Sequence, residues 1–239
     1  MPKASREQLG RQEMPTRPAE ERKRCFNEVA LGYTMEMAVA EASRCIQCKK
    51  PQCVTGCPVQ VRIPEFILAV REGRLREAAD LLKDKNSLPA ICGRVCPQET
   101  QCEAKCVLGR RGEPVAIGRL ERFVADWERS QGMTVPSVPE STGKNVAVIG
   151  AGPAGLTVAG DLAKMGHHVE ILEALHVPGG VLMYGIPEFR LPKDVVQAEI
   201  RYLQDLGVEV RTNVVIGKLY TLEELLERYD AVFLGTGAG

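Results

Sequence analysis

Eight of the nine cysteines in this chain fall into two short runs that an ordinary core helix or strand would not contain. The first run, CIQCKKPQCVTGCP over 45–58, has the spacing C-x2-C-x4-C-x3-C-P. The second run, CGRVCPQETQCEAKC over 92–106, has the spacing C-x3-C-x5-C-x3-C. The ninth cysteine, Cys25, precedes both runs. Cysteines clustered in this way form disulfides, bind zinc or hold iron–sulfur clusters.

Disulfides are the least favoured of these three interpretations. An odd number of cysteines leaves at least one outside any set of pairs. The N-terminal stretch MPKASREQLGRQEMPTRPAEERKRC is polar and lacks the apolar core of a signal peptide. No stretch approaches the ~20 apolar residues that span a membrane. We therefore expect a cytoplasmic protein, in which thiols stay reduced and clustered cysteines bind metal or do redox work.

The number and setting of the cysteines favour iron–sulfur clusters over zinc. A structural zinc site uses four ligands, so eight cysteines would require two such sites. In bacterial ferredoxin runs, the cysteine directly before a proline ligates the second cluster of a pair. Cys57 and Cys96 both precede a proline. We expect one cluster on Cys45, Cys48 and Cys53, with Cys57 ligating a second cluster; two zinc sites remain the alternative from spacing alone.

The first ~135 residues predict short helices and loops without a sheet. The first expected helix starts near Pro18 and stops before Gly32, and the second follows Thr34, its expected N-cap, through Cys45. Three further helices are expected over 63–73, 74–85 and 117–131. Residues 132–144, GMTVPSVPESTGK, are rich in Pro, Ser, Thr and Gly and are predicted to be a linker. We therefore predict a helical domain over 1–131.

After the linker the sequence alternates between strand and helix patterns. Strands are expected over 145–150, 167–173, 208–213 and 230–237, and helices over 153–166, 193–207 and 221–229. Thr221 and Glu224 have the spacing of a capping box. Alternation of this kind is typical of a Rossmann-like, doubly wound parallel sheet, so we predict an α/β domain over 145–239.

The stretch NVAVIGAGPAGL carries a dinucleotide fingerprint. Gly150, Gly152 and Gly155 follow an expected strand and open an expected helix, and Glu173 ends the next strand 18 residues beyond Gly155. The first glycine permits a tight turn, the second lets a pyrophosphate approach, and the third lets helix and strand pack closely. Glu173 would accept a hydrogen bond from a ribose hydroxyl and disfavour a 2′-phosphate. The loop is predicted to bind FAD or NAD(H), with a bias towards FAD; a glycine-rich turn in an unrelated α/β fold is the alternative.

With both features present, the chain resembles the family of the small (beta) subunit of NADPH-dependent glutamate synthase and related FAD/iron–sulfur oxidoreductases. The relatives include the flavin-and-cluster portion of dihydropyrimidine dehydrogenase and the large subunit of NADH-dependent ferredoxin:NADP oxidoreductase, also called sulfide dehydrogenase. The resemblance extends from about Arg22 to Gly239. It is carried by the stretches FNEVALGYT, RCIQCKKPQC, GCPV, LPAICGRVCPQE, CEAKCV, AIGRLERF, PGGVLMYGIPEFRLPKDV and LGTGAG.

The resemblance implies two 4Fe–4S clusters in the helical domain. The family pattern places one cluster on Cys45, Cys48, Cys53 and Cys106. It places the other on Cys57, Cys96, Cys102 and Glu121. Cys92 is then left near a cluster without ligating it. The charge pattern alone would make Glu121 a solvated helix residue, so its assignment rests on the resemblance.

The resemblance also implies a set of FAD contacts. They fall on Val95, Gly150, Ala151, Gly152, Pro153, Ala154, Gly155, Glu173, Gly179, Gly180, Val181, Arg190 and Ile216. Val95 would approach the isoalloxazine from the cluster side, Arg190 would lie near the flavin end, and Ile216 would line the adenine region. The alternative for Arg190 is a surface salt bridge.

The implied function is electron transfer from NADPH through FAD and the clusters to a partner subunit, which in glutamate synthase is the large subunit. No catalytic acid–base residue is expected, since the cofactors carry the chemistry. No second G-x-G-x-x-G/A fingerprint follows the first, so we expect an N-terminal portion with an incomplete FAD domain, the NADPH site elsewhere, and no activity of the chain alone.

Two alternatives stay open. One is the ferredoxin- or NAD-linked relative, and the other is a non-catalytic metal-binding docking module. Lys plus Arg equals Asp plus Glu, 31 each, which argues against nucleic-acid and membrane partners. A homo-oligomer is compatible with the sequence.

Overall fold

The computed structural model describes residues 10–238. The chain divides into two compact units, residues 1–132 and 133–239. Within the described part, no helix is both long and apolar enough to cross a membrane.

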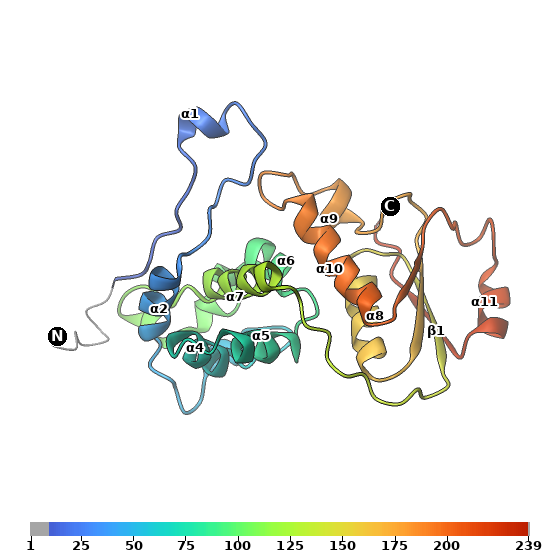
Figure 1. Ribbon diagram of the computed structural model, residues 1–239, viewed down its shortest axis with the longest axis horizontal. Coiled ribbons are helices and arrows are strands. Elements are labelled where there is room, and N and C mark those ends of the chain that lie inside the picture. The colour runs from blue at the N-terminus through green and yellow to red at the C-terminus, as the bar shows by residue number, and fades with distance from the viewer. Residues whose placement is uncertain (1–9, 239) are drawn as a thin grey trace. The chain divides into compact units, whose positions relative to one another are not determined.

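The first unit is built from short helices (Figure 1). Its α-helices are α1 (Ala19–Arg22), α2 (Met35–Ser43), α3 (Gln52–Thr55), α4 (Ile63–Arg71), α5 (Leu75–Lys83), α6 (Pro89–Val95) and α7 (Ile117–Gln131). Its 3-10 helices include η2 (Gln98–Thr100), η3 (Glu103–Lys105) and η4 (Val107–Arg110). Thr34 caps α2 as predicted, because its hydroxyl accepts a hydrogen bond from Met37 N.

The hydrophobic core of this unit lies among α2, α4, α5 and α7. Phe66, Ile67 and Leu82 are each 1% exposed, and Leu120 is fully buried. Half-buried cysteines of both runs pack against the edge of this core: Cys45, Cys53, Cys57 and Cys106. The runs themselves lie mostly in loops and short helical turns. The core helices α2, α4, α5 and α7 therefore support the two irregular segments that contain the cysteine runs.

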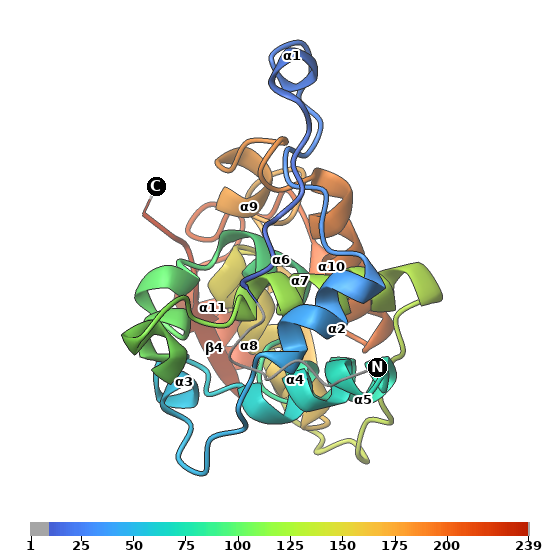
Figure 2. The ribbon, with the colours of Figure 1, turned by 90° about the vertical axis from the view of Figure 1, so that its left-hand side faces the viewer.

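The expected helix from Pro18 to Gly32 is wrong. Only α1 is helical, and it buries none of its residues. The flanking segments instead pair as an antiparallel ribbon, in which Arg17 N donates to Val29 O at 2.9 Å and Thr16 forms a bridge with Ala30. Figure 1 and Figure 2 both show this ribbon projecting from the helices of its unit. A helix here would have no apolar surface to pack against, and isolated short helices are marginal in water.

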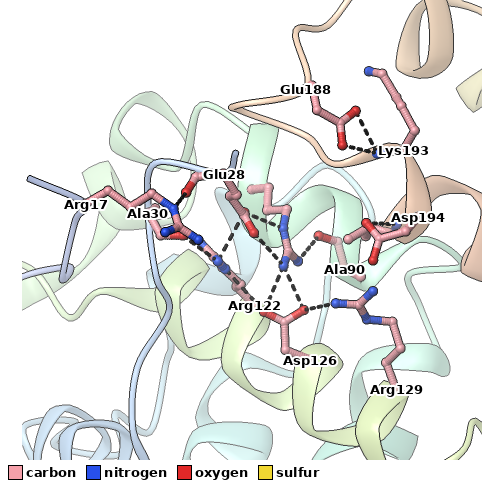
Figure 3. Close-up of polar contacts among 12 residues, drawn as sticks. Arg17, Glu28, Ala30, Ala90, Arg122, Asp126, Arg129, Glu188, Lys193 and Asp194 are labelled. Atoms are coloured by element: carbon pink, nitrogen blue, oxygen red, sulfur yellow. Dashed lines mark hydrogen bonds and ion pairs between the residues drawn. The ribbon is translucent and has the colours of Figure 1, made fainter. Parts of the chain in front are cut away.

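Two buried arginines join the base of this ribbon to α6 and α7 (Figure 3). Arg94 donates to Glu28 at 2.8 Å and to both carboxylate oxygens of Asp126 at 2.8 and 2.9 Å. Arg122 donates to Ala30 O at 2.9 Å and forms ion pairs with Glu28 and Asp126. Buried charges require such complete pairing. The network thus fixes the ribbon against α7 and against α6, the helix that contains Cys92.

The second unit contains a parallel sheet. Its strands are β1 (Asn145–Ile149), β2 (His168–Leu172), β3 (Glu209–Arg211) and β4 (Ala231–Leu234), in the order β3-β2-β1-β4. Its helices are α8 (Pro153–Lys164), α9 (Val181–Tyr184), α10 (Lys193–Asp205) and α11 (Leu222–Arg228). Figure 1 shows α8 and α10 on one side of the sheet and α11 on the other. The predicted doubly wound parallel sheet is confirmed, and so is the capping box of Thr221 and Glu224.

The strand order creates a natural binding position. The chain leaves β1 for β2 on one side, while β4 pairs with β1 on the other. The connections therefore diverge at the carboxyl end of β1. In open α/β sheets, ligands bind outside the carboxyl ends of the strands at such a switch point.

Candidate functional site

A cavity of about 1170 Å³ opens at this end of the sheet. Among its lining residues are Gly150, Gly152, Pro153, Ala154, Glu173, Leu175, Gly180, Val181, Tyr184, Val214, Val215, Ile216, Leu222, Leu234 and Thr236. They come from the turn after β1, the end of β2, the loop before α9, the segment after β3 and the end of β4. The cavity is large enough for a nucleotide cofactor, since ligand pockets commonly measure about 300–1,000 Å³.

The three fingerprint glycines have distinct structural roles. Gly150 has φ +97°, and a Cβ there would meet Gly235 O at 2.4 Å. A Cβ on Gly155 would lie 1.9 Å from Gly150 O, so α8 packs directly on the turn. Gly152 has open space around its Cβ position, and it is the N-cap of α8. The turn therefore leaves a gap for a ligand at Gly152, where amides of the helix N-terminus suit an anion.

Glu173 is held at the cavity wall by two backbone amides. Its side chain is buried, with Oε2 accepting from Ala151 N at 2.7 Å and Oε1 accepting from Leu175 N at 2.8 Å. A carboxylate has about four lone-pair positions, so each oxygen keeps capacity for a further donor such as a hydroxyl. The glycine turn and the carboxylate are thus joined by one hydrogen bond.

Most of the FAD contacts expected from the resemblance share this cavity, and five do not line it. Ala151 and Gly179 lie behind its wall, where Gly179 N donates to Ala151 O at 2.9 Å. Gly155 is buried under the turn, and Arg190 is exposed outside the lining. Val95 belongs to the first unit, at the end of α6.

The sequence reasoning missed several lining residues. Tyr184, Val214, Leu222 and Thr236 line the cavity without having been expected there. Two of these positions could have been found from the sequence. Val214 directly follows the strand expected over 208–213, and Thr236 lies near the end of the strand expected over 230–237, where ligands of parallel sheets bind.

In the first unit, four cysteines line one small cavity. Cys45, Cys48, Cys53 and Cys106 line the same cavity, whose apolar walls include Ile63, Ile67, Val115 and Ile117. Burial raises the pKa of the Cys53 thiol to about 12, and the charges of the neighbouring Cys45, Cys106 and Cys48 add to this effect. Four thiols from two separate runs therefore converge on one apolar site. This donor set fits a 4Fe–4S cluster, which four cysteines hold.

Of the remaining cysteines of the two runs, Cys92 lies in α6 and Cys96 is its C-cap, while Cys57 follows α3 and Cys102 is the N-cap of η3. Burial raises the pKa of Cys102, followed by the charges of Glu121, Glu103 and Cys57. A hydrogen bond with Cys92 lowers the pKa of Cys96 to about 7. The charges of Glu121 and Cys57 thus act on Cys102, and Cys96 shares a hydrogen bond with Cys92.

None of the nine cysteines, all of which lie in the described part of the chain, forms a disulfide. Among residues 10–238, no group of three or more His, Cys, Asp or Glu side chains is arranged to hold a single metal ion.

Family models match both units. Residues 21–133 match "dihydropyrimidine dehydrogenase domain II, 4Fe–4S cluster". Residues 115–238, more than half of the chain, match "pyridine nucleotide-disulphide oxidoreductase". The chain belongs to the pyridine nucleotide-disulphide oxidoreductase family. The helical unit of this family member is therefore of the 4Fe–4S type, and its second unit is a Rossmann-like oxidoreductase domain, as the sequence predicted.

Curated relatives agree with the resemblance to glutamate synthase. The chain is 41% identical over 231 residues to the glutamate synthase [NADPH] small chain of Halomonas elongata, covering 96% of the chain and 49% of that protein. It is 40% identical over 230 residues to the Escherichia coli K12 small chain, with the same coverage. It is also 40% identical over 212 residues to the NAD-dependent dihydropyrimidine dehydrogenase subunit PreT of Escherichia coli O157:H7, covering 89% of the chain and 52% of that protein.

The chain spans about half the length of these relatives. The predicted resemblance to the glutamate synthase small subunit is confirmed. Among solved structures, FprA of Mycobacterium tuberculosis in complex with NADPH is 29% identical over 40% of this chain and 23% of that chain, with a TM-score of 0.36.

Proposed function

We propose that this chain carries FAD in the second unit and two 4Fe–4S clusters in the first, and that it transfers electrons between them. The electron donor is NADPH, and the acceptor is a partner subunit of the glutamate synthase large-subunit type. The helical domain covers 1–131, a linker covers 132–144, and the FAD domain begins at 145. The observation that carries this proposal is the convergence of Cys45, Cys48, Cys53 and Cys106 on one apolar cavity.

The residues of the second unit supply binding and orientation. Gly152 leaves room for the pyrophosphate at the N-terminus of α8. Glu173, whose carboxylate is held by two backbone amides, accepts a hydrogen bond from a ribose hydroxyl. Gly180 and Val181 line the same cavity, with Gly180 packed against Gly152, and Ile216 lines the adenine end in this proposal. Bound FAD supplies hydride acceptance and one-electron release, and 4Fe–4S clusters supply one-electron transfer.

The residues of the first unit supply ligands and exclude water. One cluster takes Cys45, Cys48, Cys53 and Cys106, and the apolar lining of that cavity lowers its contact with solvent. The second cluster takes Cys57, Cys96, Cys102 and Glu121. An oxygen ligand changes the net charge and softness of the site, both of which set the reduction potential. Val95, next to Cys96, faces the flavin in this proposal, with Arg190 near the flavin end.

Flash reduction of the flavin tests the electron path directly. In anaerobic protein, we expect the reduced flavin to reoxidise while the absorbance of the clusters bleaches at the same rate, independently of protein concentration. Cys25→Ser serves as the control, because Cys25 precedes both runs, and it should leave the rate unchanged. A flavin that stays reduced beside oxidised clusters would rule out transfer between the two units.

A further inference from the structure

Asn86 connects the proposed oxygen ligand with the spare thiol. It lies in the loop between α5 and α6 and is 7% exposed. Its Nδ2 donates to Glu121 Oε1 at 2.8 Å. Its Oδ1 accepts from Leu88 N at 3.0 Å and from Cys92 Sγ at 3.6 Å. Every polar atom of this buried amide is therefore engaged, and one of its partners is Glu121.

The backbone around this contact is closely packed. A Cβ on Gly93 would lie 2.5 Å from Arg122 N, so α6 and α7 touch backbone to backbone directly beside Cys92 and Glu121. A Cβ on Gly118, one turn earlier in α7, would lie 2.3 Å from the side chain of Gln98. Because both helices are fixed, the position of the Glu121 carboxylate depends on its own side-chain rotamer.

We propose that Asn86 is a positioning residue that selects the Glu121 rotamer used for ligating the second 4Fe–4S cluster. This inference rests on the proposed function, in which Glu121 completes the ligand set of that cluster. A glutamate has several accessible rotamers, and ligating carboxylates are commonly held by outer hydrogen bonds that fix their orientation. The buried amide of Asn86 supplies such a bond. The same amide also accepts a hydrogen bond from the Cys92 thiol, next to Cys96.

Asn86 has a second, structural role that must be separated from positioning. Its Oδ1 accepts the Leu88 amide just before α6 begins, a local contact that stabilises the turn. Asn86→Asp keeps an acceptor oxygen for Leu88 and Cys92. It removes the donor to Glu121 and places a like charge against that carboxylate. A purely structural role predicts that this variant resembles the wild type.

The test compares Asn86→Asp, Glu121→Gln and the double variant by iron content and by redox titration of each cluster, with folding checked by circular dichroism. In Asn86→Asp we expect one cluster to be affected. Either its midpoint potential shifts to more negative values, because net charge sets the potential, or iron falls from about eight to about four per chain. The other cluster should be unchanged. The double variant removes the charge repulsion and should return towards the Glu121→Gln values.

Asn213→Asp provides a matched control, since Asn213 is an exposed asparagine of the second unit, and it should change neither quantity. Unchanged iron and unchanged potentials in Asn86→Asp would overturn the proposal. An equal loss of clusters or of folding in Asn86→Asp and in the double variant would also overturn it, because the loss would then not depend on the contact with the Glu121 carboxylate. If the wild type itself holds one cluster or none, the proposed function fails, and that result appears before any variant is compared.

Discussion

Gly155→Ala is expected to be the most damaging single substitution in the nucleotide turn. The new Cβ would lie 1.9 Å from Gly150 O and 3.1 Å from a methyl carbon of Val148. The first of these contacts is with backbone, so it is relieved only if α8 moves away from β1. Overpacking of this kind costs roughly 1–3 kcal/mol and sometimes more. We expect a loss of at least about 2 kcal/mol in the free energy of unfolding, measured by urea denaturation without FAD, together with loss of FAD binding.

Gly152→Ala is the matched control for this substitution. It lies in the same turn, but its Cβ would meet nothing within 4 Å, and its φ of −73° suits any residue. The new methyl group would occupy space that the proposed pyrophosphate approaches. We therefore expect unchanged unfolding without ligand and at least tenfold weaker FAD binding, about 1.4 kcal/mol. FAD binding at wild-type affinity in Gly152→Ala would contradict the placement of the pyrophosphate.

Cys53→Ser is expected to have the largest effect on the cofactor content. Cys53 lines the small apolar cavity together with the other three proposed ligands of the first cluster. A serine hydroxyl is a poor replacement for a thiolate at iron. We expect iron and acid-labile sulfide to fall from about eight to about four per chain, while the second cluster keeps its signal in electron paramagnetic resonance.

Cys25→Ser is the control for this loss, because Cys25 lies between α1 and α2, outside both cysteine runs. It should retain the full iron content. Equal losses in both variants would show that the effect is general instability. Full iron in Cys53→Ser would remove this cysteine from the ligand set.

The sequence predicted those features that depend on local pattern. The change to strand–helix alternation after residue 144 predicted the parallel sheet, because fully buried strands and amphipathic helices leave clear periodicities. The spacing of Gly150, Gly152 and Gly155 predicted a turn whose geometry the structure shows at each position. Thr34 and the pair Thr221 and Glu224 predicted two helix N-termini.

Features that depend on tertiary contacts could not be predicted in this way. The residues between Pro18 and Gly32 have helical propensity, yet they form a ribbon joined to α6 and α7 by Arg94 and Arg122. The contact of Asn86 with Glu121 spans 35 positions in the sequence, and no local pattern marks it. The assignment of Glu121 as a ligand together with Cys102 rests on the family resemblance and stays a prediction, because its own sequence context is that of a solvated helix residue.

The central claim is that the first unit holds two 4Fe–4S clusters and the second holds FAD. Iron, acid-labile sulfide, zinc and flavin content of anaerobically purified protein tests it most directly. The account predicts about eight irons and eight sulfides per chain, with one FAD and no stoichiometric zinc. Zinc without labile sulfide would contradict it and would leave a structural metal-binding unit beside a nucleotide-binding fold.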